Sequence, residues 1–252
     1  MRMRIKIGLN LSAVALAALA VALPARADRR TLIRAYEYQT QPQGNLEFEL
    51  WNEIETPKSS FADSLITHKL ELEYGLTDRW DVALYHVFQQ GGPAASSEPF
   101  HFDSWRLETR YRFAEKGVLP VDLMLYFEVE RPAKLGDPFA IEQKIILEKS
   151  FGPLAVVSNL VAEQRLGTGE NWKYELEIDL GLRYELAPAF RIAGEVWGIR
   201  EKEGAAEAET ALYAGPSVSF ATKKFWLQVG AGFGLNDDAK RVQFRSVLGL
   251  NL

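Results

Sequence analysis

A strict alternation of apolar and charged residues is the feature of this sequence that most constrains its fold. In the stretch 68–88, HKLELEYGLTDRWDVALYHVF, apolar side chains such as Leu70, Leu72 and Leu84 occupy even positions, and the charged side chains lie at odd positions between them. Successive side chains of a β-strand point to opposite faces of the sheet. Because GLTDR has the composition of a turn, the stretch predicts a β-hairpin with one apolar and one charged face.

The same alternation recurs along most of the chain, and no helical period of 3.6 residues competes with it. It predicts one all-β domain over residues 44–252, with about twelve strands at 44–53, 64–76, 79–90, 102–114, 119–131, 138–151, 154–165, 171–186, 189–201, 207–221, 224–235 and 240–252. Short turns follow the even-numbered strands, and longer loops usually follow the odd-numbered ones. This asymmetry is typical of outer-membrane barrels, in which the short turns are periplasmic.

The length of the uncharged strand faces indicates which solvent they meet. Most faces extend over about nine or more residues, enough for a tilted strand to cross the hydrocarbon of a bilayer. Aromatic residues gather at both ends of the strands, as they do at the two interfaces of a membrane. We therefore predict a transmembrane antiparallel up-and-down β-barrel with both termini periplasmic and with Leu72, Leu125 and Leu180 facing lipid. The alternative is a large soluble β-sandwich or a lipocalin-like barrel.

The first 27 residues have the features of a secretory signal. Arg2, Arg4 and Lys6 precede an apolar stretch at 13–23, and ARA at 25–27 is a small-x-small cleavage site. The alternative is an uncleaved anchor. Export in this form predicts a bacterial outer-membrane location, with membrane lipid and the barrel-assembly machinery as partners. Residues 28–43, between the signal and the barrel, are interpreted in three ways: a periplasmic lead, an extra strand, or a lid over the lumen.

Composition narrows the functional classes. Without the four basic residues of the signal, the chain has a net charge of −9, which argues against a nucleic-acid partner. The absence of cysteine excludes disulfides and thiolate chemistry, and three histidines are too few for a His-rich metal site. We therefore expect no cofactor and no metal. The sequence does not predict the oligomeric state.

The charged strand faces predict the lining of the barrel interior. Counting alternate positions in each strand places about sixteen carboxylates and nine basic groups there. Opposed like charges destabilise a sheet, and the predicted register nevertheless places Glu73 opposite Asp81 and Glu142 opposite Glu163. The lumen-lining residues singled out on this basis are Glu71, Glu73, Arg106, Arg110, Arg112, Glu128, Glu130, Glu142, Lys144, Glu175, Glu177 and Arg183.

A charged interior supports two readings: a selective channel for a small solute, or a salt-bridged structural core without conduction. Inward aromatic residues could pack a plug inside it. The third and weakest alternative is a lipid-active enzyme, for which the predicted register pairs His68 with His86 on the lipid face. No serine lies beside that pair in this register, so we expect no enzymatic activity.

Three stretches carry a resemblance to known proteins: AYEYQTQPQGNLEFELWNEIET at 35–56, LELEYGLTDRWDVALYH at 70–86 and EQKIILEKSFGP at 142–153. Together they resemble a family of uncharacterised bacterial outer-membrane barrels, and this resemblance covers most of the chain after the signal. The hairpin YGLTDRWDVAL is more distantly similar to the transporter-like outer-membrane barrels linked to phenol degradation. The resemblance implies a fold and a location, and it brings over no catalytic residues.

Overall fold

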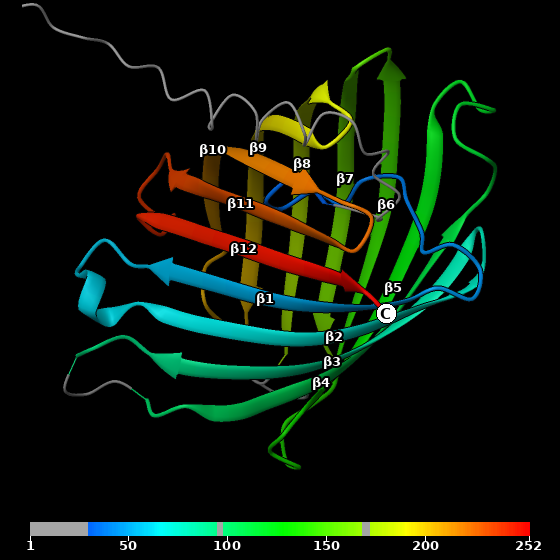
Figure 1. The fold of residues 1–252 in the computed structure, drawn as a ribbon. Coiled ribbons are helices and arrows are strands. Elements are labelled where there is room, and N and C mark those ends of the chain that lie inside the picture. Colours follow the sequence, from blue (N-terminus) through cyan, green and yellow to red (C-terminus); the bar gives the residue numbers. More distant parts are fainter. Residues whose placement is uncertain (1–29, 95–97, 168–171) are drawn as a thin grey trace, which may run out of the picture.

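Twelve antiparallel strands close into one barrel in the computed structural model, which describes residues 30–94, 98–167 and 172–252 (Figure 1). Each strand pairs with its neighbours in sequence, and β1 pairs with β12 to close the ring. The predicted signal lies outside the described residues. The strands are β1 (Leu46–Thr56), β2 (Leu65–Thr77), β3 (Trp80–Gly91), β4 (His101–Arg112), β5 (Asp122–Pro132), β6 (Ala140–Phe151), β7 (Leu154–Arg165), β8 (Lys173–Ala187), β9 (Phe190–Glu203), β10 (Glu209–Ala221), β11 (Phe225–Gly234) and β12 (Val242–Asn251).

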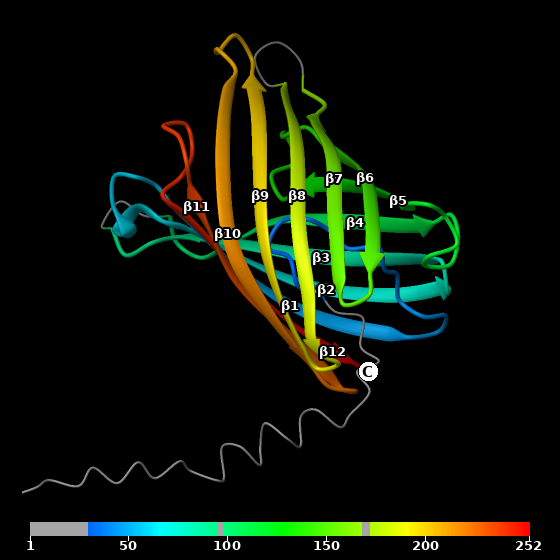
Figure 2. The ribbon, with the colours of Figure 1, turned by 90° about the horizontal axis from the view of Figure 1, so that it is seen from above.

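This architecture confirms the predicted all-β fold and the number of strands. Short turns at one end of the barrel alternate with longer loops at the other, and β1 begins and β12 ends at the short-turn end (Figures 1 and 2). One of these turns consists of Gly152 and Pro153, and Gly152 adopts φ 61°, a left-handed conformation that glycine reaches without steric cost. A 3₁₀ turn, η1 (Phe61–Asp63), lies in the loop between β1 and β2.

The two faces of the wall differ as the alternation predicts. Leu72, Leu125 and Leu180 lie on the outer face, where 43–51% of each residue is exposed. An aromatic belt surrounds the outer face at the short-turn end, formed by Tyr74, Trp80, Tyr111, Phe151, Tyr184, Phe190 and Phe225. The inner face carries the charged residues and six buried aromatic residues: Trp51, Tyr85, Tyr126, Trp197, Tyr213 and Trp226.

The register of the β2–β3 hairpin differs from the predicted one. Thr77 pairs with Trp80, so the turn is formed by Asp78 and Arg79 and lies later in the chain than the predicted register requires, and a β-bulge between Gly75 and Thr77 changes the pairing by one more residue. Glu73 therefore lies opposite Ala83, and the predicted pair of Glu73 with Asp81 is wrong. The predicted pair of Glu142 with Glu163 is confirmed.

The same shift separates the two histidines. His68 lies opposite Phe88, and His86 lies opposite Leu70, so the predicted His68–His86 pair is wrong. The ring of His68 forms a hydrogen bond of 2.8 Å with Asn52.

Among the described residues, no helix is long and apolar enough to cross a membrane.

Candidate functional site

The segment 30–43, directly before β1, lies inside the barrel (Figures 1 and 2). We call it the interior segment. Its Leu32 packs against Val157 of β7, and its Ile33 packs against Trp197 of β9. Leu32 and Ile33 are almost completely buried, with 2–3% of each residue exposed. The segment therefore fills part of the lumen with its own apolar core.

Two glycines in the barrel wall make room for these side chains. A Cβ at Gly181 would lie 2.7 Å from the side chain of Leu32, and a Cβ at Gly230 would lie 2.5 Å from that of Ile33. Real Cβ atoms do not approach a neighbour so closely. Glycine at these two wall positions therefore leaves the space that Leu32 and Ile33 of the interior segment occupy.

One carboxylate of the wall accepts hydrogen bonds from three consecutive backbone N–H groups of the segment. Glu195 of β9 is 4% exposed, and it accepts from Ile33 at 2.7 Å, Arg34 at 3.0 Å and Ala35 at 2.5 Å. An irregular segment inside a barrel has no neighbouring strand to satisfy its N–H groups, so side chains must do so. Hydrogen bonds to a charged acceptor are also stronger than those between neutral groups.

The same arrangement continues along the interior segment, with acceptors from three other strands. Asn159 of β7 accepts from the backbone N–H of Tyr36 at 2.6 Å, Glu148 of β6 from that of Tyr38 at 2.9 Å, and Asp81 of β3 from that of Gln41 at 2.9 Å. Asn159 also donates its side-chain amide to the carbonyl of Tyr36 at 3.0 Å. Part of the acidic character of the interior therefore serves to hold the segment.

Charged side chains of the segment are paired as well. The guanidinium of Arg34 donates to both carboxylate oxygens of Glu177, each at 2.6 Å. Glu37 lies 3.1 Å from the guanidinium of Arg183, which also contacts Glu148 at 2.9 Å. These bidentate and shared ion pairs fix the segment against β6 and β8.

A row of glutamates crosses the inner face from strand to strand. Each member lies directly opposite the next in the register, and nine of the ten strands from β10 to β1 contribute a glutamate. The row consists of Glu209, Glu201, Glu175, Glu163, Glu142, Glu128, Glu108, then Ala83 of β3, and finally Glu73 and Glu47. It begins at the loop end of β10 and finishes near the short-turn end of β1. We call it the glutamate row.

Basic side chains neutralise only part of this row. Lys144 lies 2.9 Å from Glu142, and Lys173 lies 2.8 Å from Glu201. Among the described residues no ion pair reaches Glu163, in the middle of the row. Glu73, Glu108, Glu128 and Glu175 also have an arginine or lysine partner within 4 Å. The repulsion between directly opposed carboxylates, which destabilises a sheet, is therefore offset at most positions of the row but not at Glu163.

Three cavities in the loop half of the barrel expose the upper part of the glutamate row. The first, of about 310 Å³, is lined by Glu128, Glu142, Glu163 and Glu175. A second, also about 310 Å³, is lined by Glu175, Glu201 and Glu209, and a third of about 520 Å³ shares Glu163. The first cavity also contains the basic residues Arg34, Lys69, Arg106, Lys144, Lys173 and Arg245. Its lining therefore combines both signs of charge in a space large enough for a small solute.

All twelve residues predicted to line the lumen lie on the inner face. Glu71, Glu73, Arg110, Glu128, Glu177 and Arg183 are buried, whereas Arg106, Arg112, Glu130, Glu142, Lys144 and Glu175 are partly exposed. Glu177 and Arg183 contact the interior segment, Glu130 lines the third cavity, and Arg112 lies 3.8 Å from Glu115 at the short turns. The other eight lie in two places. The first cavity holds Arg106, Glu128, Glu142, Lys144 and Glu175, and a buried cluster nearer the short turns holds Glu71, Glu73 and Arg110.

Glu177 and Arg183 were predicted from the sequence as lining residues, but the residues that accept the backbone N–H groups of the interior segment were not identified. Glu195, Asn159 and Glu148 occupy inward positions of their strands, which the alternation does predict. Their role depends on backbone atoms more than a hundred residues away along the chain, and no local pattern encodes that contact.

A closed barrel with an apolar outer face, an aromatic belt and a charged interior is a porin-like barrel of the outer-membrane type. The chain belongs to a family of unknown function, DUF6662, whose family model matches residues 24–246.

Solved structures of the same architecture include the COG4313 outer membrane channel from Pseudomonas putida F1. It has a TM-score of 0.66 and 16% sequence identity, and the match covers 88% of this chain and all of that one. The NanC porin has a TM-score of 0.61 with 8% identity, covering 81% of this chain and all of that one. The KdgM porin has a TM-score of 0.56 with 10% identity, covering 82% and 99%. These likenesses define the fold. The comparison with curated proteins gave no match.

Proposed function

We propose that this protein is a passive outer-membrane channel for small solutes, with a preference for cations, and that the interior segment is its plug. The glutamate row carries the proposal, because it places a carboxylate on nine of ten successive strands from the loop end into the interior. Rings of Asp and Glu favour cations in channels. The low dielectric of a barrel wall further strengthens the field of the charges that line it.

In this proposal the long loops face the outside, both termini are periplasmic, and the outer face contacts membrane lipid after delivery by the barrel-assembly machinery. A solute enters the cavities of the loop half and meets the interior segment below them. Passage then requires the segment to move or to leave a gap beside it. The mixed charges of the first cavity support a small polar solute over an apolar one.

The test is single-channel recording of the refolded protein in planar bilayers, with and without residues 30–43. We expect the deletion to increase conductance, because it removes the chain that fills the lumen. A folded deletion variant that stays silent would instead support a structural barrel without conduction. The dense packing of Leu32 and Ile33 against the wall is the observation that favours this second candidate.

Ion selectivity tests the glutamate row separately. In the form that conducts, with or without residues 30–43, Glu163→Gln with Glu175→Gln should lower the preference for cations. The change removes the charge of each side chain and keeps its size. Glu115→Gln with Glu185→Gln is the matched control, since both carboxylates lie at the short-turn end outside the row. The difference should shrink near 1 M salt, where screening acts beyond about 3 Å. Equal selectivity in both double variants would contradict a role of the row while leaving conduction intact.

A further inference from the structure

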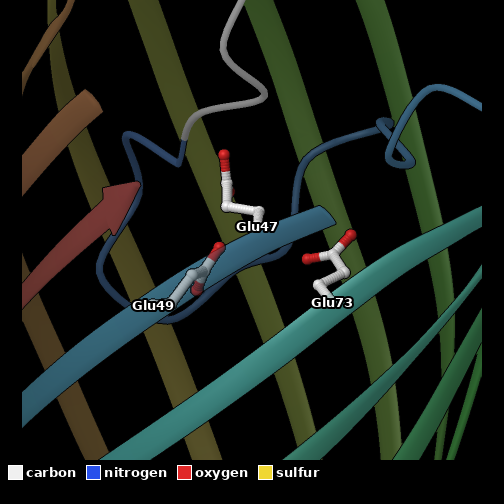
Figure 3. Close-up of side chains that lie close together, drawn as sticks. All are labelled: Glu47, Glu49 and Glu73. Carbon is white, nitrogen blue, oxygen red and sulfur yellow. The ribbon is translucent and has the colours of Figure 1, made fainter. Parts of the chain in front are cut away.

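Charge is distributed unevenly between the two faces of the barrel wall. Carboxylates gather on the inner face, where Glu47, Glu49 and Glu73 of β1 and β2 are buried close to one another (Figure 3). Two basic residues near the loop end of β9, Arg200 and Lys202, lie on the outer face instead. The membrane-facing side of β9 is therefore basic at its loop end.

Neither of these two cations has an acidic partner in the part of the chain that the structure describes. Arg200 donates a long hydrogen bond of 3.4 Å to the hydroxyl of Thr210, which carries no charge. Arg131, on the outer face of β5, differs from them, because its guanidinium donates to two backbone carbonyls of the following loop at 3.0 and 3.1 Å. Arg200 and Lys202 thus remain available to an anion from outside the chain.

An open apolar cavity of about 890 Å³ on the outer face begins beside these cations, and we call it the outer groove. Leu176 of β8 lines the groove and lies directly opposite Arg200 in the register. From Leu176 the groove follows a row of outward residues that pair from strand to strand: Ala162 of β7, Gln143 of β6, Phe127 of β5 and Thr109 of β4. This row starts near the loop end of β9 and finishes near the short-turn end of β4. The groove therefore connects the level of the lipid headgroups with the hydrocarbon.

We propose that this surface binds a phosphorylated membrane lipid of the lipid A type, with a phosphate on Arg200 and Lys202 and an acyl chain along the outer groove. Basic side chains at a membrane surface attract anionic lipids, and the planar fork of arginine matches a phosphate. Tyr174, which lies opposite Lys202, adds an aromatic ring of the kind found at headgroup level. The inference rests on the proposed orientation with the loops outside, which assigns the lipid to the outer leaflet, and it does not rest on conduction.

Native mass spectrometry of the folded full-length barrel in detergent tests this site, with lipid A as the probe. Arg200→Gln with Lys202→Gln should weaken binding about 30-fold, as expected for the loss of two basic groups at an anionic surface. Lys223→Gln with Lys224→Gln is the matched control, because it removes the same charge from the exposed turn between β10 and β11 at the other end of the barrel. Equal binding by the two double variants would overturn the proposal.

A second pair of variants tests the groove while both cations stay in place. Ala162→Trp places a large side chain in the middle of the outer groove and should weaken the binding of lipid A, whereas Val218→Trp, outward on β10 and outside the groove, should not. Equal binding by these two variants would contradict an acyl chain in the groove.

The choice of probe tests the headgroup. Phosphatidylcholine has acyl chains but no net charge and should bind more weakly than lipid A, and inorganic phosphate at the same concentration should not displace lipid A. Equal binding of the two lipids, or displacement by inorganic phosphate, would also overturn the proposal. All of these substitutions lie outside the lumen, so the conductance of the same variants tests the channel independently.

Discussion

Glu195 shows how a single side chain can organise an irregular segment inside a barrel. Its two oxygens accept hydrogen bonds from three consecutive backbone N–H groups. The edge of a strand would need several residues to accept as many. Inside the barrel no such edge is available to the segment, because the wall strands bond to each other. A carboxylate at the right inward position therefore replaces backbone pairing.

Replacing Glu195 with alanine should release the interior segment. The change leaves three buried N–H groups without acceptors, and we expect the free energy of unfolding to fall by about 2–4 kcal/mol. Denaturant titration of the folded barrel in detergent, followed by tryptophan fluorescence, measures the loss. Glu195→Gln keeps one acceptor oxygen and should lose less.

The exposed Glu115 provides the control for this experiment. Glu115→Ala removes an exposed carboxylate at a turn whose one ion pair within the described part of the chain is a long contact of 3.8 Å with Arg112, so its effect should be small. An equal loss of stability in both variants would contradict the role assigned to Glu195.

At the scale of elements, the position of a residue along the outer face of a strand determines whether it lies near the bilayer midplane or near an interface. Leu160 lies near the middle of β7 on the outer face, and Gln164 lies on the same face near the loop end. Arginine at a lipid-facing midplane position costs about 2–4 kcal/mol, and about 0–1 kcal/mol near an interface. Leu160→Arg should therefore destabilise the barrel far more than Gln164→Arg in the same unfolding experiment. Similar values for both would show that this face does not contact hydrocarbon.

The strands themselves were predictable from the sequence because their signal is local. Alternation placed all twelve, and most boundaries differ from the structure by one or two residues. The first strand was predicted from residue 44, but Gly44 has φ 78° and belongs to the turn before Leu46. The register of one hairpin was not predictable, since a turn at Asp78 and Arg79 with a bulge at Gly75–Thr77 places the same residues on each face as the predicted turn does.

The candidate site was predictable only in part, for the same physical reason. Periodicity assigns a residue to the inner face, and all twelve predicted lining residues are found there. It does not show which inward carboxylates face a cavity, which hold the interior segment and which gather near Glu71. Those differences depend on contacts inside the lumen between residues that are far apart in the chain.

At the scale of the whole molecule, the fold predicts how the protein partitions in a cell. After fractionation the full chain should appear with the outer membranes, and unheated samples should migrate differently from boiled ones, because a closed barrel resists detergent until it is heated. Gel electrophoresis of matched boiled and unboiled fractions makes this measurement. Recovery of the folded protein from the periplasm without detergent would contradict the membrane assignment.

The interior segment also bears on the order in which the chain is assembled. Closing the barrel joins Glu47 to Asn251, about 200 residues away, and contacts between such distant residues form slowly. The segment directly before β1 already binds side chains of β3, β6, β7 and β9. A chain that makes these contacts early draws its first strand toward the later ones before the final seam forms. The segment would then act as an internal template, around which the wall is wrapped and by which the search for the last strand pair is shortened.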